Sequence, residues 1–306
     1  MSMTVSDALK LVRDVQTVVG APEVCRTAAE YLARKLGART SVVAEPVSLS
    51  PGVFQLLAGG TSARRVADKA CVRVLARPDG SGEVRAGSCH SLFGAVAYLL
   101  GGLADRDITE TEAGVMLKPA FAWNRSCYDI FLTQEARVQA GLDPETYVRR
   151  LAESGFTHIE VNALAFPMGL ETGPKGEVYP MFYTYCPALD QFVCSRLNAG
   201  LYPPYYLSAN LGLLKRNAAL ARKHGLVPGL LCFEPRSVPE DFFTRYPMLR
   251  GARVDHPFRS FKPRYTMTLA HPVVHEHYAE LVRALMAEVP ELGFLDVWTN
   301  DSGSGF

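Results

Sequence analysis

The chain has 306 residues, of which 48% are apolar and 21% are charged. These values are ordinary for a soluble globular protein with one large domain or two moderate ones. The formal net charge is +1, because 32 basic side chains are balanced by 31 acidic ones. Basic residues do not form a stripe either, so the charge pattern does not indicate nucleic-acid binding.

Targeting and membrane signals are not visible. The most apolar stretch, residues 91–104, is too short to span a bilayer. The N-terminus lacks a basic region followed by an unbroken apolar run, so no secretory signal is expected. Seven cysteines are scattered without a CxxC motif. An odd number of scattered cysteines is typical of a protein whose thiols stay free in a reducing compartment. A cytoplasmic location is therefore expected.

The first part of the chain alternates between helical and strand patterns. Residues 22–36 carry apolar side chains at helical spacing and end at Gly37. Strands are then expected, the last two as a hairpin, at 40–45, 53–57, 71–75 and 83–86. An apolar helix follows at 91–103. This order predicts a two-layer α/β domain over residues 1–117. Cys89 and His90 are not predicted to react together, since adjacent side chains usually point apart.

From residue 118 to residue 306 strands alternate with helices, which predicts a parallel sheet. The expected strands are 120–124, 157–162, 226–233 and 294–298. The expected helices are 143–155, 207–223 and 271–289. Asp143 is a suitable N-cap for the first helix, and Pro144 suits its first turn.

Polar residues follow the expected strands, as in a (β/α)8 barrel, whose active site lies at the carboxyl ends of its strands. They are Glu160, Asn162, Glu234, Arg236, Asn300 and Asp301. A doubly wound sheet would also place ligand groups there, but it usually carries a glycine-rich phosphate turn, and no such turn follows any expected strand. The fold class is therefore expected to be α/β, with a small two-layer domain and an incomplete (β/α)8 barrel.

The segment between the second expected strand and the next helix is long, spanning residues 163–206, and is rich in aromatic rings. Such loops are usually functional or disordered, and the aromatic content argues against disorder. Each ring is expected to pack in a local core. At least one, Tyr205 among the candidates, is expected to contact a sugar ring.

Three segments resemble glycoside hydrolases of family 20, the β-hexosaminidases, and of family 67, the α-glucuronidases. Residues 87–100 resemble the last helix of their N-terminal domain. Trp123-Asn-Arg125 resembles the first barrel strand, and residues 294–301 resemble the fourth. The resemblance implies a small α/β domain before a catalytic (β/α)8 barrel, an oligosaccharide substrate and no cofactor. Asn300-Asp301 departs from the family 20 pattern of Asp-Glu.

Glycoside hydrolysis normally needs two carboxyl groups, and Asp301 and Glu234 are the predicted catalytic pair. For Asp301 the alternative is a loop-capping role in an Asx turn. For Glu234 the alternative is an ion pair with Arg236 or Arg125. The predicted substrate-binding residues are Arg125, Asn162, Trp298, Asn300, Arg236 and Tyr205. Glu160 and Asp296 lie within strands and are expected to support the site from inside the barrel.

Three histidines, His271, His275 and His277, form an HxxxHxH pattern. On a helix the first two would share a face, as metal ligands sometimes do. However, Pro272 makes His271 the entry to the helix, and no HExxH motif occurs. Surface or capping histidines are expected rather than a metal site.

A complete barrel typically needs about 250 residues, more than follow residue 120. The chain is therefore expected to be a truncated chain or gene fragment, inactive alone, and pairing of two copies is left open. The leading hypothesis is a glycoside hydrolase, and the alternative is a non-catalytic carbohydrate-binding relative. An unrelated aldolase or isomerase barrel is disfavoured, because no expected strand ends in a lysine.

Overall fold

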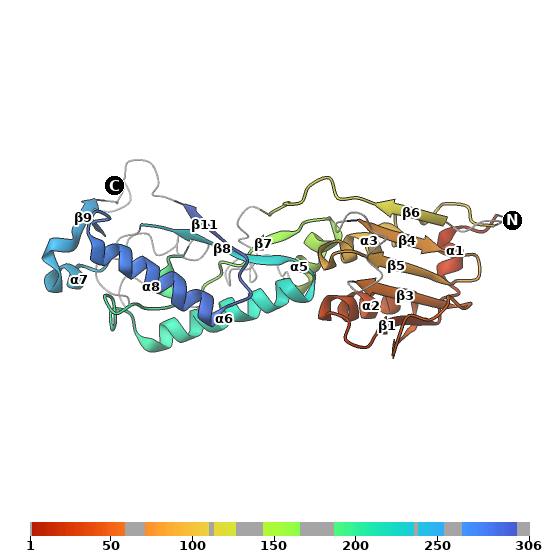
Figure 1. Ribbon diagram of the computed structural model, residues 1–306, viewed down its shortest axis with the longest axis horizontal. Helices are drawn as coiled ribbons and strands as arrows, with labels where there is room; N and C mark the ends of the chain where they lie inside the picture. The colour runs from red at the N-terminus through yellow and green to blue at the C-terminus, as the bar shows by residue number, and fades with distance from the viewer. Residues whose placement is uncertain are drawn as a thin grey trace. The chain divides into compact units, whose positions relative to one another are not determined.

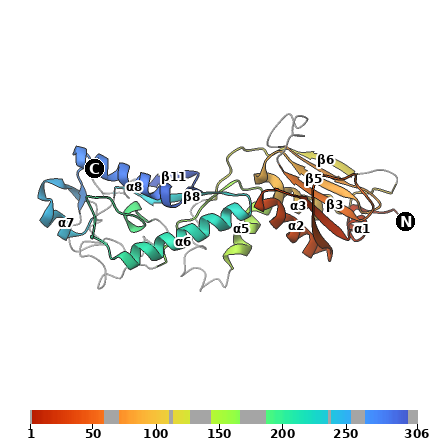
Figure 2. The same cartoon turned by 60° about the horizontal axis from the view of Figure 1, so that its bottom comes forward.

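A computed structural model of the chain is drawn in Figures 1 and 2. It describes residues 2–58, 71–109, 113–126, 143–165, 187–235, 238–253 and 265–298. Contacts divide the chain into two compact units. The first holds the chain up to Arg125 together with Glu145–His158 and Leu220–Leu226. The second holds most of the remainder, including Ile159–Ala219 and all residues from Val227 onward.

The first unit is built on a six-stranded sheet of order β2-β1-β3-β5-β4-β6. Its strands are β1 (Asp14–Val18), β2 (Arg39–Val43), β3 (Val53–Ala58), β4 (Val72–Ala76), β5 (Gly82–Ala86) and β6 (Ala113–Leu117). Strands β1, β2, β3 and β5 are parallel to their neighbours in this group. Strand β4 runs antiparallel between β5 and β6. The sheet is therefore mixed.

Helices cover this sheet on one side (Figure 2). They are α1 (Val5–Leu9), α2 (Glu23–Leu36) and α3 (Leu92–Leu100), the last entered through the 3-10 turn η2 (Cys89–Ser91). Helix α2 ends at Gly37, whose φ of 68° is left-handed and suits glycine. Helices α2 and α3 pack side by side and against the strands, with apolar faces that include Leu32 and Phe93. The expected α/β layering is confirmed.

The two predicted helices and the predicted strands of this unit are present, including the hairpin. Its strands pair from Val72 opposite Ala86 to Ala76 opposite Gly82. Helix α1 and strands β1 and β6 were not predicted. Strand β1 begins with Asp14, which is 6% exposed and accepts a hydrogen bond from Ser41 Oγ at 2.8 Å. A polar residue buried in this way conceals a strand from hydrophobic patterning.

The second unit contains a three-stranded sheet of order β11-β8-β7. These strands are β7 (His158–Glu160), β8 (Val227–Phe233) and β11 (Phe294–Trp298). Strands β8 and β11 are parallel, and Phe294 lies opposite Gly229. Strand β8 is buried over residues 228–232 because it is the middle strand. Parallel pairing puts the carboxyl ends of β8 and β11 at one edge of the sheet.

Helix α5 (Pro144–Glu153) precedes β7 and belongs to the first unit from Glu145 onward. The helices and short turns that follow β7 along the chain (Figure 1) are η5 (Leu189–Gln191), α6 (Pro204–Lys223), α7 (Glu240–Arg245), η6 (Pro247–Leu249) and α8 (Pro272–Glu288). Helix α6 begins three residues before its predicted start, and His271 caps α8 as expected. An antiparallel pair, β9 (Arg250–Arg253) and β10 (Tyr265–Met267), was not predicted and forms a separate sheet. None of the described helices has the length and apolarity that crossing a membrane requires.

The predicted strand at residues 120–124 is wrong. The backbone forms an isolated parallel bridge between Arg125 and His158, and the carbonyl oxygen of Asn124 accepts the amides of Thr157 and His158, but no strand forms. Phe121 and Trp123 are 68% and 53% exposed, so the alternating apolar pattern is not buried against a core. The amide of Asn124 is satisfied by the side chain of Thr157, at 2.8 Å, rather than by a neighbouring strand.

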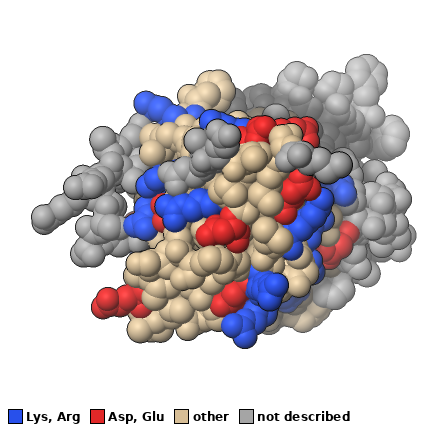
Figure 3. Space-filling view, turned by 90° about the vertical axis from the view of Figure 1, so that its right-hand side faces the viewer, with Lys and Arg blue, Asp and Glu red and all other residues tan. Residues whose placement is uncertain are grey.

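Basic and acidic side chains are interspersed on the face shown in Figure 3. Opposite charges also pair locally within the six-stranded sheet. Glu83 lies 3.0 Å from Arg85 and 3.6 Å from Arg73. Such alternation produces no extended field of one sign over this face.

Candidate active site

The candidate site is centred on Glu234, the residue that follows β8. Its amide donates a hydrogen bond to the carbonyl oxygen of Trp298 at 2.9 Å, which extends the β8–β11 ladder by one step. The predicted carboxylate and the predicted aromatic residue therefore leave neighbouring strands at the same edge. This is the geometry that parallel strands impose on residues at their carboxyl ends.

Two donors from distant segments hold the carboxylate of Glu234. The amide of Leu189, in η5, donates to Oε1 at 2.8 Å. The hydroxyl of Tyr278, in α8, donates to Oε2 at 3.3 Å. Both carboxyl oxygens of Glu234 are thus acceptors. The contacts fix the orientation of Glu234 from two sides.

Tyr278 is kept as a donor by its surroundings. Burial and the negative charges of Glu234 and Asp190 raise the pKa of Tyr278 well above its usual value. The phenol therefore retains its proton through the neutral range. Asp190 is 8% exposed and follows Leu189 in η5, so a second carboxyl group lies in the electrostatic environment of the site.

A buried polar network positions η5. Gln191 Oε1 accepts from the amide of Ala188 at 2.8 Å, and Gln191 Nε2 donates to the hydroxyl of Tyr206 at 2.6 Å. Asn210 Nδ2 donates to the carbonyl oxygen of Gln191 at 3.1 Å. Tyr206 and Asn210 belong to α6, so this helix determines where the Leu189 amide lies.

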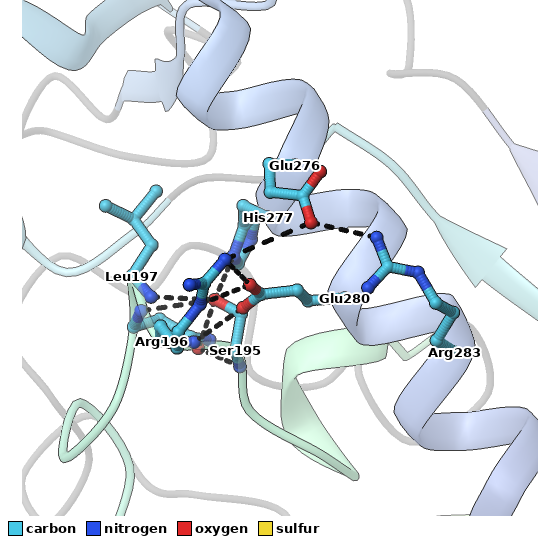
Figure 4. A network of polar contacts seen from close by, with 8 residues as sticks. Ser195, Arg196, Leu197, Glu276, His277, Glu280 and Arg283 are labelled. Carbon is cyan, nitrogen blue, oxygen red and sulfur yellow. Dashed lines mark hydrogen bonds and ion pairs between the residues drawn. The ribbon is translucent and has the colours of Figure 1, made fainter.

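The segment that follows η5 is joined to α8 by the polar contacts in Figure 4. Ser195 Oγ and His277 Nδ1 are 2.7 Å apart, and both residues are buried. Glu280 accepts the amide of Arg196 at 2.8 Å and also pairs with its guanidinium group. Helix α8 therefore holds the segment through His277 and holds Glu234 through the adjacent Tyr278.

Burial lowers the pKa of His277 to about 4, a shift only partly opposed by the charge of Glu280. The imidazole is consequently neutral at pH 7. The Arg196 contact lowers the pKa of Glu280. The Ser195–His277 contact is a buried neutral hydrogen bond, while Arg196 and Glu280 form an exposed ion pair.

The structure describes three of the predicted substrate-binding residues in the second unit. Asn162 is 2% exposed, and its Oδ1 accepts the amide of Leu231 at 2.9 Å, so that oxygen is used within the sheet. Trp298 and Tyr205 are 44% and 65% exposed. Both rings have enough exposed surface to contact a sugar, and their role in binding one stays a prediction.

Other predicted site residues lie elsewhere. Arg125 belongs to the first unit, where its backbone bridges His158. Asp301, Asn300 and Arg236 lie outside the described residues. Their proposed roles are untested. Glu160 is 1% exposed within β7, as expected for an inward-facing strand residue.

The aromatic segment divides according to burial. Phe192, Tyr202 and Tyr206 are at most 4% exposed and pack internally, as expected for most rings. Phe166 and the tyrosines and phenylalanine at 179–185 lie outside the described residues.

Sequence reasoning missed Asp190, Leu189 and Tyr278. Asp190 could have been found, because it is an acidic residue within a largely apolar run, Ala188-Leu-Asp-Gln-Phe-Val193. A carboxyl group in such a run is expected to be buried, and buried carboxyl groups are candidates for functional sites. The Leu189 contribution is a backbone amide and has no sequence signature. Tyr278 is one tyrosine on a helix, and nothing local indicates that its hydroxyl reaches β8.

The three helix histidines do not gather around one point that could bind a metal. His271 Nδ1 accepts the amide of Val273 at 3.2 Å and caps α8, which confirms its predicted capping role. His277 is buried, contrary to the surface location expected. Within the described ranges, no group of three histidine, cysteine or acidic side chains could hold a metal ion.

No family model matches the sequence, and no curated protein matches it either. Solved structures do. A GH138 enzyme targeting pectin rhamnogalacturonan II matches 93% of this chain with a TM-score of 0.60 at 12% identity. An inactive mutant of the GH20 exo-β-N-acetylglucosaminidase from Vibrio harveyi matches 95% with 0.51 at 13%. A family 89 glycoside hydrolase from Clostridium perfringens matches 80% with 0.50 at 12%.

These matches show a glycoside hydrolase-like fold. The chain spans 30% of the GH138 enzyme, 46% of the GH20 enzyme and 30% of the family 89 enzyme. At such identities the likeness concerns the fold, since one fold can host many activities. The expected similarity to glycoside hydrolases is confirmed at this level, and the family 67 resemblance stays a prediction.

Proposed function

We propose that this chain is a glycoside hydrolase-like enzyme that binds an oligosaccharide at the carboxyl ends of β8 and β11. Glu234 is one of its two catalytic carboxyl groups. The observation that carries the proposal is the convergence of the Leu189 amide and the Tyr278 hydroxyl on Glu234, at the end of the sheet where the exposed Trp298 closes β11. A carboxylate oriented from two sides at the carboxyl end of parallel strands suits cleavage of a bound sugar.

The role proposed for Glu234 follows from its contacts, and Asp301 is proposed for the remaining role. Because both oxygens of Glu234 accept hydrogen bonds, Glu234 is assigned to the ionised member, a base or nucleophile. Asp301, which follows β11 in sequence, is assigned to the acid that protonates the leaving oxygen. Asp190 contributes negative charge that, with burial and Glu234, raises the pKa of Tyr278 further above its usual value. Trp298 supplies a ring face for the sugar.

The finer architectural proposal is that residues 118–306 form part of a (β/α)8 barrel, preceded by a hexosaminidase- or glucuronidase-like domain at residues 1–117. Two observations support it. The chain order of β7, β8 and β11 is also their order in the sheet, as consecutive barrel strands require. The parallel bridge between Arg125 and His158 adds one further segment next to β7, and this segment also precedes β7 in the chain.

The alternative is a non-catalytic carbohydrate-binding relative. It is favoured by Asn300, which stands where the family 20 pattern has an acidic residue, and by the exposed rings of Trp298 and Tyr205. Such a protein would retain the binding surface and lack turnover.

The test uses the 306-residue chain, a glycan array and a panel of aryl glycosides. Hydrolysis is expected, in place of the inactivity that the short barrel suggested, because Glu234 is already held by two donors. Glu234→Gln is expected to reduce the rate by about 100-fold or more, because acid–base groups contribute on that scale. Glu288→Gln is the matched control, since Glu288 is exposed and pairs with Lys215 at 2.6 Å on the protein surface. It should leave turnover unchanged.

Each result has a separate meaning. Glycan binding without hydrolysis by the unmodified chain supports the non-catalytic alternative. Hydrolysis that survives Glu234→Gln contradicts the assignment of Glu234. If the chain neither binds nor hydrolyses any member of the full panel, both proposals are contradicted.

A further inference from the structure

Two cysteines of the first unit lie in contact although they are 64 positions apart in sequence. Cys25 is in the first turn of α2, and Cys89 opens the 3-10 turn η2 that leads into α3. Their thiols hydrogen-bond to each other. Both are free, and α2 and α3 pack side by side at this point.

A third segment lies against the same place. A Cβ on Gly225 would lie 2.7 Å from the carbonyl oxygen of Cys89 and 3.1 Å from Val24 Cγ2, beside Cys25. His90 Nδ1 also contacts the carbonyl oxygen of Gly225, at 2.5 Å. The turn around Gly225 therefore packs on both cysteine-bearing segments and limits how far they can separate.

The two thiols differ in exposure. Cys25 is 0% exposed, whereas Cys89 is partly exposed. They also differ in acidity. The hydrogen bond from Cys25 lowers the pKa of Cys89 to about 7, against the effect of burial and with help from Arg222. The same contact and burial raise the pKa of Cys25. About half of Cys89 is thus thiolate at pH 7, while Cys25 stays a thiol.

We propose that Cys25 and Cys89 form a reversible disulfide, in which partly exposed Cys89 reacts first with a small-molecule disulfide and buried Cys25 resolves the product. This proposal is independent of the glycosidase assignment. It assigns a redox modification site to the first unit, because an accessible thiolate beside a second thiol is the arrangement of redox-sensitive cysteines.

The exchange proceeds in two balanced steps. The thiolate of Cys89 attacks one sulfur of the oxidant R–S–S–R, forming a Cys89–S–S–R bond and releasing R–S⁻. This step removes the negative charge that had held the proton on Cys25. The sulfur of Cys25 then attacks Cys89 Sγ and releases a second R–S⁻, and the Cys25 proton leaves with it as R–SH. The protein is oxidised by two electrons and the oxidant is reduced to two thiols.

The test exposes the fully reduced chain to oxidised glutathione and maps its peptides by mass spectrometry without reduction. A peptide pair joined through Cys25 and Cys89 is expected, and it should disappear after reduction. Cys25→Ala should instead accumulate glutathione on Cys89, because the resolving thiol is gone. Cys194→Ser is the matched control, since Cys194 is an exposed cysteine outside the pair, and it should leave the cross-link intact.

Two further readouts do not depend on a variant that folds. The rate of cross-linking should rise about tenfold between pH 6 and pH 8, whereas a thiol of ordinary pKa would give nearly a hundredfold rise. The oxidised chain should unfold several degrees higher, because the bridge constrains the unfolded chain. Stable glutathione on Cys89 of the unmodified chain, or no Cys25–Cys89 peptide at any oxidant concentration, would overturn the proposal.

Discussion

The backbone of Glu234 is tied to the backbone of Trp298 by a hydrogen bond of 2.9 Å between neighbouring parallel strands. The relative position of these two backbone segments is therefore set by the sheet and not by a loop. Sites built on regular elements hold their geometry more closely than sites on loops. The same edge receives Leu189 and Tyr278, so one sheet, one turn and one helix define the candidate site.

The first prediction concerns glycan binding. Replacing Trp298 by alanine should weaken oligosaccharide binding about 3- to 10-fold, because an aromatic contact contributes roughly 0.5–1.5 kcal/mol. Isothermal titration calorimetry with a glycan that binds the unmodified chain measures this change. Met248→Ala is the control, since Met248 is 84% exposed and is not among the residues that hydrogen-bond to Glu234 here. Equal affinity of Trp298→Ala and the unmodified chain would remove Trp298 from the site.

Helix periodicity and strand punctuation predicted most of the fold. The helices that became α2, α3 and α8, and the strand that became β8, bury apolar faces that their sequences display, whereas β11 forms with no residue fully buried. The strand predicted at 120–124 was wrong, because its large apolar side chains, Phe121 and Trp123, remain exposed instead of packing on a core. Patterning identifies residues able to be buried, and tertiary packing decides whether they are.

The candidate site was predicted less completely than the fold. Glu234 and Trp298 could be identified because residues after parallel strands share an edge. Their partners could not, since Leu189 contributes an amide and Tyr278 contributes from a helix 44 residues later. Asn162 shows a second limit, because its side chain completes the sheet by accepting the Leu231 amide. A polar residue at a strand end can thus be structural.

The second prediction concerns the Tyr278 hydroxyl. Tyr278→Phe should lower the free energy of unfolding by roughly 1–3 kcal/mol, because a partly buried carboxylate oxygen loses its donor. Urea unfolding at pH 7 measures the change. Tyr205→Phe is the matched control, because Tyr205 is 65% exposed, and it should shift stability by less than about 0.5 kcal/mol. A Tyr278→Phe protein as stable as the unmodified chain would mean that water replaces the phenol at Glu234.

The third prediction is a pH dependence from His277. Its pKa is about 4 in the folded chain and 6.5 in the reference state, so the unfolded state binds more protons between these values. The contribution of His277 is fully present above pH 6.5 and is lost as pH falls toward 4. Across that window stability should fall by up to about 3 kcal/mol from this group alone.

Urea unfolding between pH 7.5 and pH 4.5 tests this dependence. Because His158 and His224 also have lowered pKa values, the slope that belongs to His277 is the difference between the unmodified chain and His277→Gln. His275→Gln is the control, since His275 is exposed on the same helix. If His277→Gln retains the full slope, the buried Ser195–His277 contact does not account for it.

The fourth prediction tests the β8–β11 pairing that supports the site. A Cβ on Gly229 would lie 2.2 Å from the ring of Phe294, its partner on β11, so Gly229→Ala must displace that ring. Overpacking of this kind costs about 1–3 kcal/mol, and the strand that carries Phe294 also carries Trp298.

Gly212→Ala is the matched control. The nearest atom to a Cβ added at Gly212, beyond the backbone of its own helix, would be the end of the Arg216 side chain at 3.5 Å. Removing a glycine from the interior of α6 should stabilise the chain by about 0.5–1 kcal/mol. Thermal unfolding should therefore move in opposite directions for the two variants, and equal shifts would contradict the close approach of Phe294 to β8.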